Sequence, residues 1–411
     1  MKKCLICGSS QFQIHVSENT AVCQSCNTVY KLSELVGDVP QQSAAPAKSE
    51  DFIIEAGTLR RYVGQDVDVV VPDGIKVIGG GQSGWTSYAD PFRTKPIHHA
   101  GSNGAFSYMS ALRSVQLPKS VRSIQDIAFA GCDSLKKIVI PEGTEYIGSG
   151  AFRNCTALEE VVLPTTLKSI GDEAFVDCRA LRAIVIPKGV TTLGKRAFQN
   201  CTALERVSVP GTVKSIVSAV FQGCSALTEL DLGEGIERIG ERDYHEWSPF
   251  DGCERLEHLR LPESLKIIDG GTFSHLPLRE IVIPNGIQFI GPYAFDRCKQ
   301  LEKLTLPDIF PGAVPENRAN CSSSSQLHLW KDSLDSSVLM NPRVVKYVYS
   351  DLCYGCDRLR TIIGGRKCPP QIFRGSAWFK ENYRGKCLYC LRPLPPLGRH
   401  KCLFCGAMPE K

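Results

Sequence analysis

Residues 151–171 read Ala-Phe-Arg-Asn-Cys-Thr-Ala-Leu-Glu-Glu-Val-Val-Leu-Pro-Thr-Thr-Leu-Lys-Ser-Ile-Gly, and this stretch decides the fold. Its pattern recurs with a fixed period of 23 residues, most clearly as cysteines that each lie three residues after a phenylalanine. The cysteines are Cys132, Cys155, Cys178, Cys201 and Cys224, and the phenylalanines are Phe129, Phe152, Phe175, Phe198 and Phe221. A fixed period of this length predicts a repeat solenoid in which each coil stacks on the next.

Each repeat unit contains a short stretch that alternates as a β-strand does. In one unit the apolar residues Leu135, Ile138 and Ile140 are spaced so that they face one side, which predicts a strand with that side in the core. Pro141 follows and can end the strand, because a proline there need not donate to the ladder. The Ile-Gly pair at 147–148 is then expected to turn the chain, and the next phenylalanine to fill the interior.

The unit Ala-Phe-x-x-Cys-x-x-Leu-x-x-Val-x-Leu-Pro-x-x-Leu-x-x-Ile-Gly resembles the BspA-type leucine-rich repeat family. The resemblance covers residues 65–306 well and a degraded stretch to residue 379 less well. It implies a solenoid with a β-strand and a loop or short helix in each 23-residue coil. Members of the family are usually surface or secreted adhesins, so the resemblance also implies a repeat surface that binds other molecules.

The cysteines within the repeat are expected to be packing residues. Met109 and Leu276 occupy the same repeat position, so the position accepts a compact apolar side chain, and a buried cysteine behaves as one. Cys353 and Cys356 have the spacing of a metal knuckle, but the repeat pattern places Cys356 in the cysteine column and Cys353 at the phenylalanine position. We therefore expect packing rather than metal binding for both.

The amino end has the cysteine spacing of a zinc ribbon. The pair Cys4 and Cys7 is followed, after fifteen residues, by the pair Cys23 and Cys26. Between the pairs, residues 11–16 alternate as a strand does and are followed by a turn, so a hairpin is expected to bring the four thiolates around one zinc ion. So short a module cannot bury enough apolar surface to fold alone, and zinc would supply the missing stability.

The carboxyl end repeats this arrangement with Cys387 and Cys390, then Cys402 and Cys405. Four thiolates at knuckle spacing complete a tetrahedral zinc site, although His400 could replace one of them as a ligand. The chain is therefore expected to hold two zinc ions, one at each end.

The composition is that of a globular protein, with 43% hydrophobic and 22% charged residues. The first residues lead into polar Gly8-Ser9-Ser10 instead of an apolar segment, and no run approaches the roughly 18 apolar residues that a membrane helix needs. Nineteen cysteines in such a chain indicate metal ligands and buried thiols rather than a disulfide scaffold. We therefore expect a cytoplasmic location.

Four parts of the chain are predicted. They are a zinc ribbon over 1–36, a flexible linker over 37–50, a solenoid over 51–379 and a second zinc ribbon over 380–411. The solenoid is predicted to be regular over 105–306 and degraded over 307–379. Because a terminal coil has a neighbour on one side alone, it needs a cap, and the predicted caps are residues 51–66 and 369–379.

Two columns of outward-facing strand residues are candidate interaction surfaces. Val139, Val162 and Val185 share one repeat position, and an apolar stripe on an exposed sheet either marks a contact surface or simply suits a strand. A neighbouring column alternates in charge, and opposite charges on adjacent coils are expected to reinforce the stacking register. Its members are Lys136, Glu159, Arg182, Glu205, Thr228, Glu257, Arg279 and Glu302.

Two insertions interrupt the repeat between the Ile-Gly pair and the next phenylalanine. One follows Gly79 and contains Trp85, and the other follows Gly240 and contains Tyr244 and Trp247. Tryptophan and tyrosine are enriched in binding hot spots, and insertions in repeat proteins often lie on the binding face. Alternatively, these rings fold back and cover the edge of the solenoid.

These features predict a non-catalytic scaffold that binds a protein partner, because no grouping of serine, histidine and acid is visible. One alternative is nucleic-acid binding through the zinc ribbons, for which the tail from Lys380 has an excess of basic charge and residues 1–50 do not. The other alternative is an enzyme built at the insertions. The sequence identifies neither the partner nor the oligomeric state.

The purified protein is expected to contain two zinc ions per chain, because two complete sets of four cysteines at knuckle spacing occur in it. Chelation should unfold the terminal modules and leave the circular dichroism of the solenoid largely intact, since the coils bury their own core. Metal analysis checks this prediction. Three or more ions per chain would contradict it and would assign metal to Cys353 and Cys356 or to the pair His98-His99.

Overall fold

The computed structural model describes residues 12–15, 20–23, 29–31, 48–79, 104–240, 248–291, 293–307, 352–363, 373 and 376–382. The chain divides into two compact units, Met1–Ile236 and Glu237–Lys411. In both units a coil of the repeat has three sides, which are a first strand, a shorter second strand and a run of turns that contains the phenylalanine.

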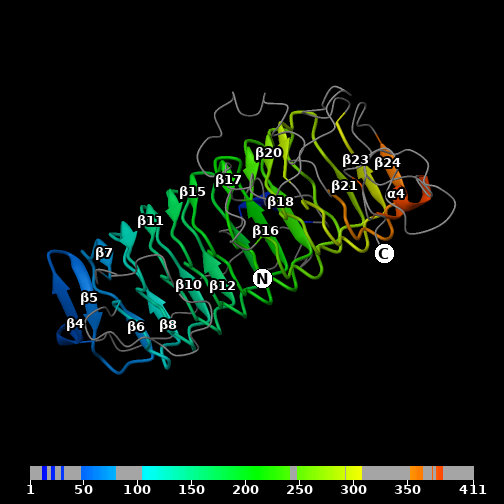
Figure 1. Ribbon diagram of the computed structural model, residues 1–411. Coiled ribbons are helices and arrows are strands. Elements are labelled where there is room, and N and C mark those ends of the chain that lie inside the picture. The colour runs from blue at the N-terminus through cyan, green and yellow to red at the C-terminus, as the bar shows by residue number, and fades with distance from the viewer. Residues whose placement is uncertain are drawn as a thin grey trace, which may run out of the picture. The chain divides into compact units, whose positions relative to one another are not determined.

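The first side of the amino-terminal unit consists of parallel strands that lie one coil apart. They form the ladders β6-β8-β10-β12 and β14-β16-β18. The strands are β6 (Asp68–Val70), β8 (Ser114–Gln116), β10 (Lys137–Val139), β12 (Glu160–Val162), β14 (Ala183–Val185), β16 (Arg206–Val209) and β18 (Glu229–Leu232). Figure 1 shows the strands of this unit following one another in chain order, from blue to green. The predicted pairing of a strand with its neighbour in the next coil is confirmed within each of these two ladders.

A second strand of two residues lies where the sequence predicts a turn. The second strands are β7 (Val77–Ile78), β9 (Ser123–Ile124), β11 (Tyr146–Ile147), β13 (Ser169–Ile170), β15 (Thr192–Leu193) and β17 (Ser215–Ile216). The prediction of a turn at Ile147 is therefore wrong. Tyr146 and Ile147 pair in register with β9 on one side and β13 on the other, so even two residues form part of a parallel ladder. The turn begins at Gly148, where a Cβ atom would lie 2.4 Å from the backbone nitrogen of Asp126.

The third side is held by backbone hydrogen bonds that all point the same way. In the coils of Phe129, Phe152, Phe175 and Phe198, the N–H groups of the phenylalanine, and of the residues two before and two after it, donate to carbonyl groups of the next coil. We call these three bonds the rung; for Phe152 and its two flanking donors, each N···O distance is 2.8 Å. The flanking residues have positive φ, which is the region that glycine, asparagine and aspartate adopt most readily. After the phenylalanine they are Tyr108, Gly131, Asn154, Asp177, Asn200 and Gly223, and before it Ile127, Gly150, Glu173, Arg196 and Ala219.

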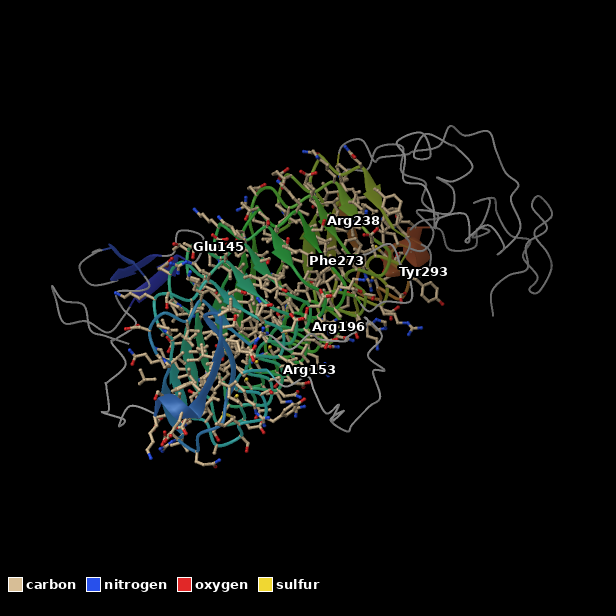
Figure 2. All side chains as sticks on the ribbon, turned by 90° about the vertical axis from the view of Figure 1, so that its left-hand side faces the viewer. Glu145, Arg153, Arg196, Arg238, Phe273 and Tyr293 are labelled. Carbon is tan, nitrogen blue, oxygen red and sulfur yellow. The ribbon has the colours of Figure 1, made fainter. Side chains whose placement is uncertain are left out.

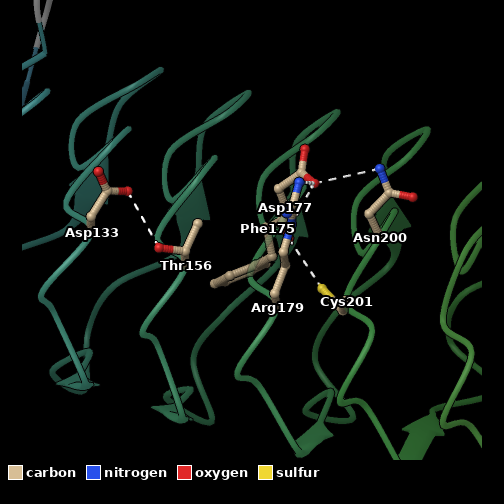
Figure 3. Close-up of polar contacts among 7 residues, drawn as sticks. All are labelled: Asp133, Thr156, Phe175, Asp177, Arg179, Asn200 and Cys201. Atoms are coloured by element: carbon tan, nitrogen blue, oxygen red, sulfur yellow. Dashed lines mark hydrogen bonds and ion pairs between the residues drawn. The ribbon is translucent and has the colours of Figure 1, made fainter. Parts of the chain in front are cut away.

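Phenylalanine rings fill the interior of the amino-terminal unit as one stack. Six consecutive rings, from Phe106 to Phe221, have no exposed surface, centroid distances of 5.0 to 5.8 Å and nearly parallel planes. The column cysteines are buried beside them, as predicted. Each thiol also donates a hydrogen bond to the phenylalanine carbonyl of the preceding coil; Cys201 Sγ lies 3.2 Å from Phe175 O (Figure 3). The position therefore accommodates a compact side chain that carries a donor.

An antiparallel hairpin caps the first coil of this unit. It consists of β4 (Phe52–Glu55) and β5 (Thr58–Tyr62), and it continues the second-strand sheet through β7. Tyr62 stacks between Phe52 and Phe106, with centroid distances of 5.0 and 5.6 Å. Burial and a hydrogen bond to Asp66 raise the pKa of Tyr62 to about 12, so its hydroxyl stays protonated. The predicted cap over residues 51–66 is confirmed.

A separate three-stranded antiparallel sheet lies near the amino terminus of the sequence. Its strands are β1 (Phe12–His15), β2 (Thr20–Cys23) and β3 (Val29–Lys31). β1 and β2 form the hairpin predicted between the two cysteine pairs, with Phe12 opposite Cys23. Cys4, Cys7 and Cys26 lie outside the described residues.

The carboxy-terminal unit is built from the same coil. Its strands are β19 (Arg238–Ile239), β20 (Ile267–Ile268), β21 (Glu280–Val282), β22 (Phe289–Ile290), β23 (Lys303–Thr305) and β24 (Thr361–Ile363). β21, β23 and β24 form one parallel ladder, and β19, β20 and β22 form another. Phe250, Phe273 and Phe295 stack at centroid distances of 5.8 and 5.3 Å.

The stretch predicted to be degraded contains a regular turn and strand of the repeat. Phe295 N–H donates to Leu352 O at 3.0 Å, which puts Cys353 at the phenylalanine position, as the pattern predicts. Beyond this coil, helix α4 (Ala377–Asn382) follows, and its Ala377 N–H donates to Cys356 O at 3.1 Å. Phe373 is buried against Trp378, so the described part of the predicted carboxy-terminal cap does cover the coil.

Phe175→Ala is expected to cost about 3–5 kcal/mol of unfolding free energy, because it removes one buried ring from the stack. Cys178→Ala should cost about 1 kcal/mol, through a small cavity and the weak hydrogen bond to Phe152 O. Urea unfolding of both variants measures the difference. Equal costs would contradict the assignment of the ring as the main filler.

Candidate functional site

One column of side chains on the first-strand face is apolar and faces away from the core. Val139 is 42% exposed, and Val162, its partner in the ladder between β10 and β12, is half-buried. Val185 holds the same repeat position in β14 and is also half-buried. We call Val139, Val162 and Val185 the valine stripe. The structure places all three at the outward position predicted for them.

Polar contacts border the valine stripe. Lys137 and Glu160, on β10 and β12 beside it, form an ion pair of 2.9 Å. At one end the stripe meets Ser208, which lies opposite Val185 and donates a hydrogen bond to Asp231 at 3.1 Å. At the other end Gln116 of β8 is exposed. The continuous apolar group is therefore three coils long, and beyond Gln116 the same repeat position holds exposed Val70 on β6.

The alternating charged column is paired differently from the prediction. In the described part of the amino-terminal unit, its charged members Lys136, Glu159, Arg182 and Glu205 form no ion pair with one another, whereas Lys137–Glu160 and Arg206–Glu229 pair one residue farther along. Lys137 and Glu160 are ladder partners, as are Arg206 and Glu229, so the strand spacing brings their long side chains together. In the carboxy-terminal unit, Glu257 and Arg279 do pair, at 2.7 Å, and their hydrogen bond lowers the pKa of Glu257.

The carboxy-terminal unit exposes an apolar column of its own at the repeat position of the valine stripe. Val282 is 56% exposed and Ile363 is 46% exposed, with Thr305 between them in the ladder of β21, β23 and β24. The sequence interpretation stopped at Val185 and missed these residues. Following the same repeat position to the end of the chain would have found them.

On the turn side, charged residues tie neighbouring coils together. Glu173 accepts ion pairs from Arg153 in the preceding coil and from Arg196 in the following one, the second at 3.6 Å. Figure 2 shows Arg153 and Arg196 close together on this side. Asp177 likewise accepts from Arg179 at 3.0 Å and from Asn200 at 3.5 Å (Figure 3). These contacts satisfy charges within the repeat, and they hold the turns in register.

The column thiols Cys155 and Cys178 are poor nucleophiles. Burial raises the pKa of Cys178 well above its ordinary value and has the same effect on Cys155. A thiol of this kind stays protonated at neutral pH, and the thiolate is the reactive form. The packing role predicted for these cysteines is therefore consistent with their surroundings.

Most of the predicted metal and aromatic site residues lie outside the described residues. They are Cys4, Cys7, Cys26, Cys387, Cys390, Cys402, Cys405, His400, Trp85, Tyr244 and Trp247. Cys23 is described in its backbone, as the last residue of β2. Within the part of the chain that the structure describes, no group of three or more His, Cys, Asp or Glu residues could hold a metal ion. Among the same residues, no helix has the length and apolar character to cross a membrane.

Six copies of the BspA type Leucine rich repeat region match this chain, over residues 101–205, 145–248 and 246–363. The chain belongs to the BspA-type leucine-rich repeat family. The matched residues contain the coils described above, with their stacked phenylalanines and parallel first strands. No curated protein matches the chain.

Several solved structures are similar to this chain. One is the leucine-rich repeat protein TpLRR of T. pallidum, at 28% identity over 47% of this chain and 86% of that chain, with a TM-score of 0.40. Another is a leucine-rich repeat protein from Bacteroides ovatus, at 20% identity over 72% and 92% of the two chains and a TM-score of 0.23. A leucine-rich cell surface protein from Faecalibacterium prausnitzii is 18% identical over 79% and 96%, with a TM-score of 0.28.

Proposed function

We propose that this leucine-rich repeat protein is a non-catalytic scaffold that binds a protein partner through its first-strand face. The valine stripe carries the proposal. Val139, Val162 and Val185 lie in successive coils and face outward, while the interior is already filled by buried phenylalanine, leucine and isoleucine. These valines are thus not needed to fill the core, and an apolar group rimmed by polar residues is the usual composition of a protein contact surface.

The backbone beneath the stripe is rigid, which favours binding. Each valine is on a strand, and the register of β10 with β12 is fixed by parallel ladder bonds. The turn side of the same coils is held by the rung. A surface that is ordered before binding loses little conformational freedom when a partner docks, so more of the contact energy appears as affinity.

The rim of the stripe suits a protein partner better than a nucleic acid. Lys137 and Glu160 neutralise one another at 2.9 Å, and the exposed column of Lys136, Glu159 and Arg182 alternates in sign. Nucleic-acid binding needs a run of basic groups that can neutralise successive phosphates. The first-strand face offers no such run among the residues described.

The terminal cysteine sets are proposed to hold one zinc ion each and to serve as docking or assembly modules. The support is their knuckle spacing, together with the hairpin of β1 and β2 between the amino-terminal pairs. Cysteine thiolates at this spacing match the tetrahedral preference of zinc. The ions would stabilise modules that are too small to fold by burial alone.

Val162→Arg is expected to weaken partner binding at least about tenfold, because it places a charge in the centre of the apolar stripe. The partner can be captured with a photo-crosslinking residue at position 162 and its affinity then measured with purified protein. Thr192→Arg is the matched control, since Thr192 is an exposed strand residue on the second side of its coil. If both variants bind like wild type while remaining folded, the first-strand face is not the contact surface.

Trp247 provides a test of the insertion as a rival contact surface. If the insertion after Gly240 binds the partner, Trp247→Ala should weaken binding roughly 30-fold or more with little change in Tm, because a central interface tryptophan commonly contributes 2 kcal/mol or more. Thermal melting and affinity are measured on the same samples. A large drop in Tm with normal binding would show instead that Trp247 covers the edge of the solenoid.

A further inference from the structure

The last described coil of the carboxy-terminal unit differs from the others in its core. Its phenylalanine position is occupied by Cys353, and its cysteine position by Cys356. Both side chains have 0% exposed surface, so both face the interior of the coil. In the other coils of this unit, the phenylalanine position holds Phe250, Phe273 or Phe295. Two thiols therefore replace the usual pair of a ring and a thiol.

The turn between the two cysteines brings them within disulfide range. Cys356 N–H donates to Cys353 O at 3.3 Å, and Gly355 between them has a φ of 70°. A four-residue turn of this kind holds its end Cα atoms less than about 7 Å apart. Disulfides join Cα atoms that are about 4.4–6.8 Å apart. The same turn recurs in other coils, but there it joins a cysteine to a phenylalanine, and a bridge cannot form.

The thiol of Cys356 also has different neighbours from those of the other column cysteines. Cys298 of the preceding coil and Cys353 of the same turn both lower the pKa of Cys356, although burial acts in the opposite direction. In the amino-terminal unit, burial dominates and raises the pKa of Cys178. The Cys356 thiol donates to Phe295 O at 3.0 Å, so it must give up this hydrogen before it can attack a disulfide as the thiolate.

The position of this coil at the end of a ladder lets it open without the rest of the unit. β24 pairs with β23 on one side and ends the ladder of β21, β23 and β24. On its other side Cys356 O accepts a hydrogen bond from Ala377 N–H at the start of α4. A terminal coil has fewer stacking contacts than an internal one, so it opens at a lower free energy than the whole unit.

We propose that Cys353 and Cys356 form a reversible dithiol–disulfide site that exchanges with small disulfides such as glutathione disulfide. The Cys356 thiol loses its proton to solvent, and the thiolate attacks one sulfur of glutathione disulfide. The S–S bond breaks, and one glutathione thiolate leaves. Cys353 then loses its proton to solvent and attacks the mixed disulfide at Cys356, which releases the second glutathione. The two protein thiols are oxidised to one disulfide, and one glutathione disulfide is reduced to two thiols.

The test uses the full chain, equilibrated in glutathione buffers of increasing oxidising poise, quenched by alkylation after unfolding, and mapped by mass spectrometry. The peptide with Cys353 and Cys356 should lose both alkylation sites to an internal disulfide at a poise where Cys178 and Cys201 remain fully alkylated. Cys353→Phe is the matched variant, because it restores the residue of the repeat. It should abolish the bridge and leave Cys356 fully alkylated at the same poise.

Two results would overturn the proposal. In one, Cys353 and Cys356 stay alkylated up to the poise that oxidises Cys178 and Cys201, so the pair behaves like any buried column thiol. In the other, the bridge joins Cys298 to Cys356, so the turn pair is the wrong assignment. If Cys353→Phe does not fold, Cys353→Ala provides the same comparison. Because the readout is resolved by peptide, oxidation of the terminal cysteine sets does not affect it.

Discussion

The rung, the set of three backbone hydrogen bonds that joins the turns of successive coils from Phe129 to Phe198, fixes the backbone on which the columns of side chains are built. It requires positive φ on both sides of the phenylalanine, and a residue other than glycine pays roughly 1–2 kcal/mol for that conformation. The three bonds contribute about 0.5–1.5 kcal/mol each. Burial of the ring adds about 1.5–3 kcal/mol. Bonds and burial together outweigh the strain, which explains how Ile127 and Glu173 are held at positive φ.

Because the rung and the strand ladders repeat one backbone conformation from coil to coil, side chains at one repeat position become columns at strand spacing of about 4.8 Å. Inside, this spacing suits flat rings, and Phe129 and Phe152 stack at 5.1 Å with planes 2° apart. Outside, the same spacing lets Lys137 meet Glu160 and sets Val139 beside Val162. Packing thus restricts which residues the core positions can hold. The outward positions are not restricted in this way, so they can differ between members of the family.

The sequence predicts those parts of the fold that depend on residue types recurring at a fixed spacing. The spacing of Phe152 and Cys155 predicts the solenoid, and the same spacing correctly assigns Cys353 and Cys356 to core positions across a long interruption. The second strand was missed because two residues such as Tyr146 and Ile147 carry no periodic signal; their ladder exists through their neighbours. Glycine, asparagine or aspartate two residues after the phenylalanine, as at Gly131, Asn154 and Asp177, does indicate positive φ. Ile127, two residues before Phe129, gives no such indication. The valine stripe could be located from the pattern, but how much of each valine is exposed depends on the packed structure.

A single residue type also behaves differently at one repeat position, and the cause is what stands beside it. A column thiol in the amino-terminal unit lies next to a phenylalanine ring and donates to a phenylalanine carbonyl, as Cys178 does to Phe152 O at 3.2 Å. Burial there favours the neutral thiol, so cysteine acts as a compact donor and its chemistry is suppressed. Cys356 makes the same donation, to Phe295 O at 3.0 Å, but its own turn supplies a second thiol in place of a ring. Loss of one aromatic ring from the stack therefore changes both the volume of the core and the electrostatic surroundings of the neighbouring sulfur. In the other coils of this unit a phenylalanine ring occupies the position of Cys353, and it keeps a second thiol away from the turn. Replacing the ring by cysteine removes that separation.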